Sequence, residues 1–305
     1  MTESHGITVV IPCYNTGDYL REAVDSVLAQ ATGLDVEVVL VDDHSDDPTT
    51  RAALTETASH DTVRLLRLPE RSGVQLARTA GVRAARYAYV LPLDSDDRLA
   101  TSPELLREGT YLDRAVAILA SDPEVAFVHT LTQMFGDCDG LTISAYPCRE
   151  DLVIRKHHVP TTIVYRRADG LAAELYDPAI RKWQDWAFAV ALLATRHEHG
   201  QHNRIGFVDG PYVQYRIHAH ADRISTSNVS ELDMTRLVVA SHLHYFRHYY
   251  GDRSAEDIAQ QVNDSKPSRL VDLLHMANHS LDQALTVARH RSAELTSALH
   301  DLGIP

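Results

Sequence analysis

Short apolar runs alternate with helical segments in the first third of the chain, and this alternation constrains the fold more than any other feature. The expected strands are residues 7–11, 36–41, 63–68 and 87–93, and the expected helices between them are residues 20–28, 48–59 and 72–86. Short runs rich in valine, isoleucine and leucine are typical of strands buried on both faces. Because strands joined by single helices pair in parallel, the sequence predicts an α/β fold with a mostly parallel sheet covered by helices.

The rest of the chain is predicted to be mixed at first and then helical. The expected elements are a helix over 102–120, strands over 125–134 and 161–165, a helix over 182–195, strands over 205–208 and 213–217, and helices over 230–250, 254–262 and 267–302. An apolar stripe runs along the last helix from Leu270 to Ala288. This stripe must be covered by the rest of the chain or by a second subunit, so a homo-oligomer formed through the C-terminal helices is one expectation.

Composition excludes several classes of protein. The chain has 29 basic and 42 acidic residues and a net charge of −13, which disfavours binding to nucleic acid or to an anionic membrane. An anionic ligand must therefore be bound at a local site, and a metal ion is expected to help bind it there. No apolar run reaches the roughly 18 residues of a transmembrane helix, and the polar start does not resemble a signal peptide. Cys13, Cys138 and Cys148 lack metal-site spacing, which is typical of a cytoplasmic protein with reduced thiols.

Polar residues gather where the expected strands end. Tyr14 and Asn15 follow the first strand, Asp42 and Asp43 follow the second, and residues 94–97 follow the fourth. Ligands of open α/β sheets bind outside the carboxyl ends of the strands, so these groups are expected to converge on one ligand.

Asp94 and Asp96 are the candidates for a metal site. Two carboxylates after a buried strand can share a hard divalent cation, and Mg²⁺ or Mn²⁺ takes one or two carboxylates together with phosphate oxygens of a substrate. An Asp-x-Asp pair at a turn is also a common solvated cap, so the metal hypothesis depends on the partners of the pair.

Four motifs in the first hundred residues supply those partners. They are Ile-Thr-Val-Val-Ile-Pro-Cys-Tyr-Asn at 7–15, Val-Leu-Val-Asp-Asp-His-Ser at 39–45, Gly73 with Ala77, Arg78 and Gly81, and Leu-Asp-Ser-Asp-Asp at 93–97. Their order and spacing resemble the nucleotide-binding half of glycosyltransferase family 2, whose GT-A fold has a Rossmann-like sheet. A weaker resemblance extends to about residue 226 and includes Trp-Gln-Asp-Trp at 183–186 and Tyr-Arg-Ile-His at 215–218.

The resemblance implies a domain organisation. A catalytic domain is expected over residues 1–228, with a nucleotide-binding half over 1–100 and an acceptor half over 101–228. A helical C-terminal extension would follow over residues 229–305.

The resemblance also implies roles in binding the nucleotide. Pro12 and Tyr14 would line the base pocket, and Asp43 would accept a hydrogen bond from the imide of uracil. Arg78 would lie near the nucleotide. A competing interpretation of Asp43 is a cap on the following helix.

The remaining implied roles concern the reacting groups. Asp94 and Ser95 would bind the nucleotide, with Asp94 contacting the ribose or a metal-bound water. Asp96 would be the direct ligand of Mn²⁺ or Mg²⁺, and His218 a further ligand of the metal or the diphosphate. Asp185 would be the general base that deprotonates the acceptor hydroxyl. Asp185 as a surface carboxylate and His218 as an ordinary hydrogen-bonded histidine are the competing interpretations.

Aromatic residues and one departure from the family pattern stand next to the expected base. Trp183 and Trp186 flank Asp185 and would form platforms for sugar faces. Gln184 stands where the family often has an acid.

The sequence favours a metal-dependent inverting glycosyltransferase. It would transfer a sugar from a nucleotide sugar, a UDP-sugar in our interpretation, to a hydroxyl of a soluble acceptor such as a small metabolite or a glycan intermediate. One alternative is a nucleotidyltransferase, although the loop after the first strand has no basic residue before Arg21. A second is a non-catalytic nucleotide-sugar-binding protein, which would keep Asp43 and Asp96 but need no base.

Overall fold

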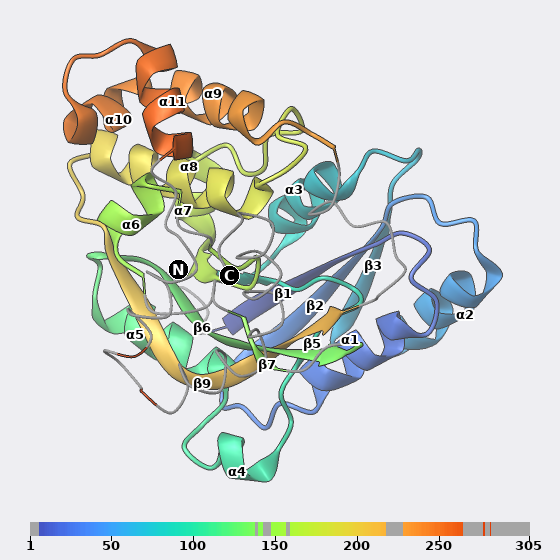
Figure 1. The fold of residues 1–305 in the computed structure, drawn as a ribbon. Coiled ribbons are helices and arrows are strands. Elements are labelled where there is room, and N and C mark those ends of the chain that lie inside the picture. The colour runs from blue at the N-terminus through green and yellow to red at the C-terminus, as the bar shows by residue number, and fades with distance from the viewer. Residues whose placement is uncertain are drawn as a thin grey trace, which may run out of the picture.

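The described part of the chain folds around one mixed sheet. The computed structural model describes residues 6–137, 140–142, 148–156, 159–217 and 228–264, and the single residues 277 and 281. The strands are β1 (Gly6–Cys13), β2 (Asp35–Asp42), β3 (Val63–Arg67), β4 (Tyr89–Pro92), β5 (Arg98–Leu99), β6 (Val125–Gly136), β7 (Gly140–Leu141), β8 (Val164–Arg166) and β9 (Arg204–Ile217). The described strands pair in the order β3-β2-β1-β4-β8-β6-β9-β5, and β7 pairs with β6 (Figure 1).

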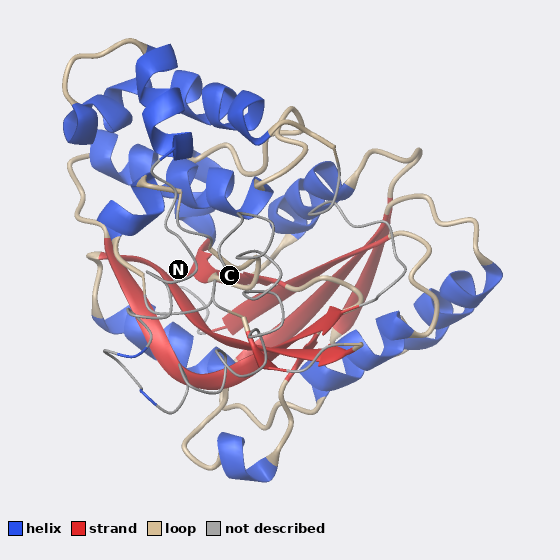
Figure 2. Ribbon diagram, in the orientation of Figure 1, coloured by secondary structure: helices blue, strands red, loops and turns tan. Residues whose placement is uncertain are grey.

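Helices lie on both faces of this sheet (Figure 2). They are α1 (Tyr19–Leu28), α2 (Pro48–Thr57), α3 (Val74–Ala84), α4 (Pro103–Leu106), α5 (Tyr111–Ser121), α6 (Glu150–Ile154), α7 (Arg167–Ala172), α8 (Gln184–Glu198), α9 (Glu231–Ser241), α10 (Leu243–Tyr250) and α11 (Ala255–Asp264). None of these described helices combines the length and the apolar character needed to cross a bilayer.

The first half confirms the predicted parallel sheet. β1 pairs in parallel with β2 and with β4, and β2 pairs in parallel with β3. Beyond β4 the sheet becomes mixed, because β8 runs antiparallel to both β4 and β6 while β6 and β9 are parallel. The carboxyl ends of β1, β2 and β4 therefore lie at one edge, as expected.

Three predicted elements are divided differently in the structure, and turn residues explain the first of these differences. The helix predicted over 102–120 is divided into α4 and α5 by Gly109, whose φ of 106° is unfavourable in a helix, and by Thr110, which starts α5 with a capping box. The helix predicted over 230–250 is divided at His242 into α9 and α10. The two strands predicted over 205–208 and 213–217 are one strand, β9, with a local irregularity in its pairing with β6.

The alternation of side chains along β1 separates the core into two layers. Val10 packs in the layer that includes α3 and α8, whereas Val9 and Ile11 pack in the layer that includes α1 and α5. Gly81 lets α3 lie very close to the sheet, since a Cβ there would stand 2.3 Å from Val10 Cγ1. The position of α3 is therefore set by a contact that only glycine permits.

The helices α9–α11 belong to the same core as α8. Val238, Phe246 and Ile258 are at most 3% exposed and lie in one cluster with Trp186 and Val190 of α8. The stripe from Leu270 to Ala288 lies outside the described residues, apart from residues 277 and 281, and so does most of the helix predicted over 267–302.

Truncation after residue 228 should give an aggregating protein. It removes the partners of α8, and each fully buried large apolar side chain contributes about 1.5–3 kcal/mol. Several such losses exceed a net stability of about 5–15 kcal/mol. Solubility and size-exclusion chromatography provide the measurement, and truncation after Asp264 is the matched control because it keeps α9–α11. A soluble, monomeric chain ending at residue 228 would show that these helices are dispensable.

Candidate active site

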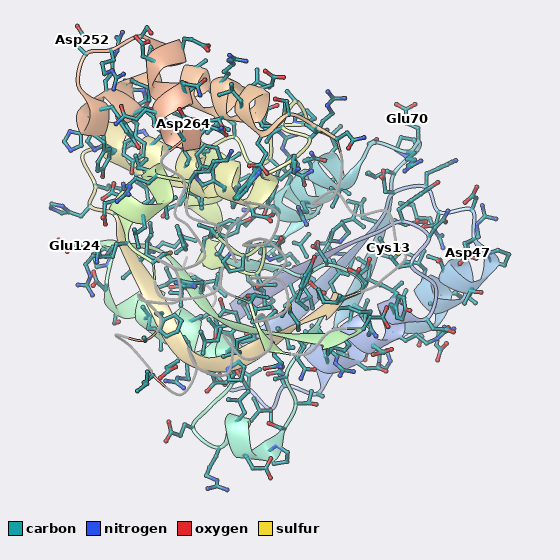
Figure 3. The ribbon with its side chains drawn as sticks, viewed as in Figure 1. Cys13, Asp47, Glu70, Glu124, Asp252 and Asp264 are labelled. Atoms are coloured by element: carbon teal, nitrogen blue, oxygen red, sulfur yellow. The ribbon has the colours of Figure 1, made fainter. Side chains whose placement is uncertain are left out.

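The loops at the carboxyl edge of the sheet are tied to one another. The Asn15 side chain donates to Asp46 Oδ1 at 2.6 Å and accepts from the backbone N–H groups of Asp46 and Asp47 at 3.0 and 3.1 Å. This amide joins the loop after β1 to the loop after β2. Figure 3 labels Cys13 at the end of β1 and Asp47 at the start of α2 on this edge. The Asn15 side chain thus fixes the two loops relative to each other.

Tyr14 and Pro12 lie where a base pocket was expected. Pro12 is buried within β1 opposite Val41, and Tyr14 is half-buried directly after the strand. The Arg71 guanidinium lies 4.0 Å from the centre of the Tyr14 ring, a cation–π contact. Sequence reasoning missed Arg71, and its position in the loop before Gly73 was the one available signal.

Asp43 holds the start of α3. Its two carboxylate oxygens accept from the backbone N–H groups of Ser72 at 2.6 Å and of Gly73 at 2.8 Å, and the residue is 4% exposed. The competing interpretation placed Asp43 as a cap on the following helix, but Asp47 caps α2. Each carboxylate oxygen has a further lone pair, so this role is compatible with one more hydrogen bond to a ligand.

The acidic loop after β4 separates into an inward and an outward part. Asp97 is buried and accepts from the backbone N–H of Arg216 at 2.8 Å, while Arg216 Nε donates to the Asp96 carbonyl oxygen at 2.8 Å. Burial and the neighbouring carboxylates raise the pKa of Asp97. Ser95 is buried, whereas Asp94 and Asp96 are only half-buried. The pair predicted from the sequence is therefore the pair that remains accessible.

Arg78 brings two distant carboxylates together. Its side chain on α3 is 4% exposed, and Nη2 donates to Asp94 Oδ1 at 2.5 Å. Nη1 lies 3.9 Å from Asp185 Oδ1, at the start of α8. Burial acts to lower the pKa of Arg78, but the two carboxylates outweigh it and hold that pKa above its usual value. Arg78 therefore stays a cation between Asp94 and Asp185.

Asp185 has the electrostatics of a base. Burial raises its pKa, Arg78 acts in the opposite direction, and the negative charge of Asp94 raises it again. About a quarter of the side chain is exposed, at 23%. A carboxylate with a raised pKa is a stronger proton acceptor than an ordinary aspartate. This is the chemistry required of a group that removes a proton from a hydroxyl.

The two tryptophans beside Asp185 differ in burial. Trp186 is fully buried and its indole N–H donates to the Val153 carbonyl oxygen at 2.7 Å, so its prediction as a sugar platform was wrong. Trp183 is half-buried and takes a left-handed backbone conformation, with φ of 64°, immediately before α8. The first turn of α8 is thus anchored on the side away from solvent.

A cavity of about 400 Å³ lies beside the same turn. Residues of α3, α8, α9 and the segment before α8 line it, among them Gln75, Tyr176, Gln184, Phe188 and His242. Gln184 Oε1 also accepts from Arg78 Nη1 at 3.5 Å. Gln184, where the family often has an acid, therefore lies between this cavity and the carboxylates. No local pattern in the sequence pointed to the cavity.

The acidic edge fits a hard divalent cation. Asp94 and Asp96 offer carboxylate oxygens, and Mg²⁺ or Mn²⁺ needs only one or two carboxylates when substrate phosphates and waters complete its shell. Among the described residues, no three histidine, cysteine, aspartate or glutamate side chains form a larger metal cluster. His218, the other predicted ligand, lies outside the described residues.

Known proteins resemble this chain in sequence. The chain matches the family model described as "Glycosyl transferase family 2" over residues 8–122. It is 35% identical over 196 residues to the putative teichuronic acid biosynthesis glycosyltransferase TuaG of Bacillus subtilis, covering 61% of this chain and 71% of that protein. It is 28% identical to the succinoglycan biosynthesis protein ExoO of Rhizobium meliloti, covering 97% and 86%.

Solved structures share the fold. TarS of S. aureus, residues 1–349 with UDP-GlcNAc, superposes with a TM-score of 0.64 at 21% identity and covers 87% of this chain and 72% of that one. The mannosyltransferase PcManGT of Pyrobaculum calidifontis, with GDP-Man and Mn²⁺, has a TM-score of 0.55 at 17% identity and covers 99% and 80%. The fold is the GT-A fold, and the class of protein is a glycosyltransferase. The chain belongs to glycosyltransferase family 2, as its sequence motifs predicted.

Asp43→Asn should weaken both the fold and the binding of UDP. An amide in place of the carboxylate puts an N–H group against one of the two backbone donors, and an unsatisfied buried donor costs about 1–3 kcal/mol. Thermal unfolding and calorimetry with UDP provide the measurement. The exposed Asp61→Asn is the control, with a change within about 0.5 kcal/mol. Unchanged unfolding and UDP affinity in the Asp43 variant would contradict both roles.

Proposed function

We propose that this glycosyltransferase transfers a sugar from a UDP-sugar to a hydroxyl of a glycan intermediate, with inversion at the anomeric carbon and with a divalent metal. One observation carries the proposal: Asp94 and Asp185, which are far apart in sequence, each lie next to a different terminal nitrogen of the buried Arg78 guanidinium. The first carboxylate stands next to the expected metal ligand and the second is the expected base. The donor phosphates and the acceptor hydroxyl would thus meet at one place.

Charge neutralisation is the first requirement of the reaction. A nucleoside diphosphate leaves with negative charge in a protein whose net charge is −13. Asp96, with Asp94 beside it, would hold Mg²⁺ or Mn²⁺. When bound, the ion would act as a Lewis acid that stabilises the charge on the leaving phosphate. PcManGT with Mn²⁺ supports this assignment at the level of the fold.

Proton transfer from the acceptor is the second requirement. The acceptor oxygen would attack the anomeric carbon while the bond from that carbon to the diphosphate oxygen breaks. The hydroxyl proton would pass to the Asp185 carboxylate, and UDP would leave on the opposite face. A single displacement with one base inverts the configuration at carbon. The raised pKa of Asp185 suits it to this step.

The proposed donor and acceptor classes follow from Asp43 and from the relatives of this chain. Asp43, with lone pairs remaining on a buried carboxylate, would accept from the uracil imide beside Tyr14. TarS binds UDP-GlcNAc, which supports a UDP-sugar. The names of TuaG and ExoO refer to the biosynthesis of teichuronic acid and of succinoglycan, which supports a glycan acceptor. We place the reaction in the cytoplasm, since Cys13 and Cys148 are buried free thiols.

Asp185→Asn should reduce turnover about 10²–10⁴-fold while UDP binding stays nearly unchanged, because the amide keeps the size and loses the basicity. The wild-type rate should fall as pH decreases through the pKa of Asp185, which lies above the usual aspartate value, since only the deprotonated form accepts a proton. UDP release from a panel of UDP-sugars measures both effects. Glu198→Gln, at the other end of α8, is the control. An Asn variant that keeps more than about a tenth of wild-type turnover would show that Asp185 is not the base.

Asp96→Ala should abolish turnover and the metal-dependent part of UDP binding. The carboxylate is the expected link between protein and cation, so its removal leaves the diphosphate without its bridge. Calorimetry with UDP, with and without Mn²⁺, separates binding from turnover. Full activity of the wild-type protein in EDTA would refute the metal mechanism.

A further inference from the structure

Lys156 carries a buried charge and is not one of the candidate active-site residues. Its side chain is fully buried, at 0% exposure, just beyond α6. Burying an ammonium group costs several kcal/mol unless it is paired and hydrogen-bonded. A lysine in this position therefore requires a surrounding that is built for it.

Two C-terminal helices supply the partners of the ammonium group. Nζ donates to Thr235 Oγ1 on α9 at 2.9 Å and to Asn263 Oδ1 on α11 at 3.1 Å. It also lies 3.4 Å from the Glu231 carbonyl oxygen and 3.5 Å from Glu231 Oε2 at the start of α9. The charge thus joins α6 to α9 and α11.

The other side of the same ammonium faces the start of α8. Nζ lies 4.9 Å from the centre of the Trp183 ring and 5.8 Å from that of Trp186, which are cation–π distances. Trp183 has a left-handed backbone conformation and directly precedes the first turn of α8. Non-glycine residues hold this conformation only when their surroundings compensate for its cost. Lys156 provides part of that surrounding.

Neighbouring contacts hold the same segment from α9. The backbone N–H of Arg181 donates to Met234 Sδ at 3.3 Å, and Lys182 Nζ lies 3.8 Å from Glu231 Oε1. Glu231 therefore lies near both Lys156 and Lys182, beside the segment that leads into α8. Asp185 follows Trp183 by two residues, so the direction of its carboxylate depends on how this segment is held.

We propose that Lys156 is a positioning residue for Asp185. Its charge holds Trp183 in the left-handed conformation and so keeps the Asp185 carboxylate beside Arg78 and the acceptor hydroxyl. This inference deepens the proposed function and rests on it. It also assigns α9 and α11 a part in catalysis, because they carry the groups that pair with Lys156.

The test combines kinetics with the fluorescence of the tryptophans in the full-length chain. Lys156→Met removes the charge and keeps an unbranched side chain. A catalytic group misplaced by about 1 Å can cost about 10²-fold in rate, so kcat should fall about 10- to 100-fold while KM for the UDP-sugar stays within about twofold. The chain has only two tryptophans, both of which face Nζ, so the emission spectrum reports directly on the loss of the charge.

Arg236→Met is the matched control. Arg236 also joins α9 to α11, through Glu256 Oε1 at 2.6 Å, but its side chain is 41% exposed, whereas Lys156 is fully buried. It should change neither kcat nor the emission spectrum. If Lys156→Met lowers the unfolding temperature like Arg236→Met and keeps kcat within about twofold of wild type, the lysine is structural only and the inference is overturned.

A double variant separates positioning from general damage. If Lys156 acts through Asp185, adding Lys156→Met to Asp185→Asn should lower kcat by less than about twofold further, whereas independent effects would multiply. If Lys156→Met does not fold, the Thr235→Val variant is tested instead, because it removes one partner of Nζ. It should lower kcat about 3- to 10-fold when Asp185 is present and hardly at all when it is combined with Asp185→Asn.

The outcomes also distinguish this inference from the proposed function. If Asp185→Asn keeps its turnover, the assignment of the base fails whatever Lys156 does. If Asp185→Asn loses turnover and Lys156→Met and Thr235→Val keep it, only the positioning role fails. If the wild-type chain releases UDP from no UDP-sugar, both are overturned.

Discussion

The buried guanidinium of Arg78 is the interaction on which the arrangement of the site depends. A fixed positive charge away from water is costly, and it is offset here by Asp94, after β4, and by Asp185, at the start of α8. Removing either carboxylate leaves the other beside the guanidinium, so the buried charge keeps one partner. The same two contacts bring the candidate reacting groups together.

The position of Arg78 follows in turn from how α3 lies on the sheet. Gly81 permits a backbone approach to Val10 that any side chain would prevent, and Asp43 accepts from the backbone N–H of Gly73 at the start of the helix. These two contacts fix the distance between α3 and the sheet and the position of the first turn of α3. A guanidinium extending from the middle of this helix then reaches the end of β4, where Asp94 lies.

The candidate base, Asp185, is held through contacts with α6, α9 and α11. Asp185 stands in the first turn of α8, and that turn is anchored by Trp186 to α6 and by Lys156 to α9 and α11. Helices α9–α11 are therefore not a separate layer with its own core, since Val238 of α9 packs in one cluster with α8. Family membership explains the sheet and its acidic edge, whereas these helices explain how the candidate base is held.

The parallel strands, the edge at which they end, the candidate pair Asp94 and Asp96 and the family could all be predicted from the sequence, because these features follow from local periodicity and from motifs a few residues long. The folded structure was needed to show that Asp43 binds the start of α3, that Trp186 is buried and that Lys156 pairs with Thr235 and Asn263. Each of these depends on contacts between residues far apart in the chain, about which local spacing carries no information. Gly109 gives a further example within a short segment. Apolar periodicity alone predicts one helix there, but the left-handed conformation of Gly109 interrupts the hydrogen-bonded turns.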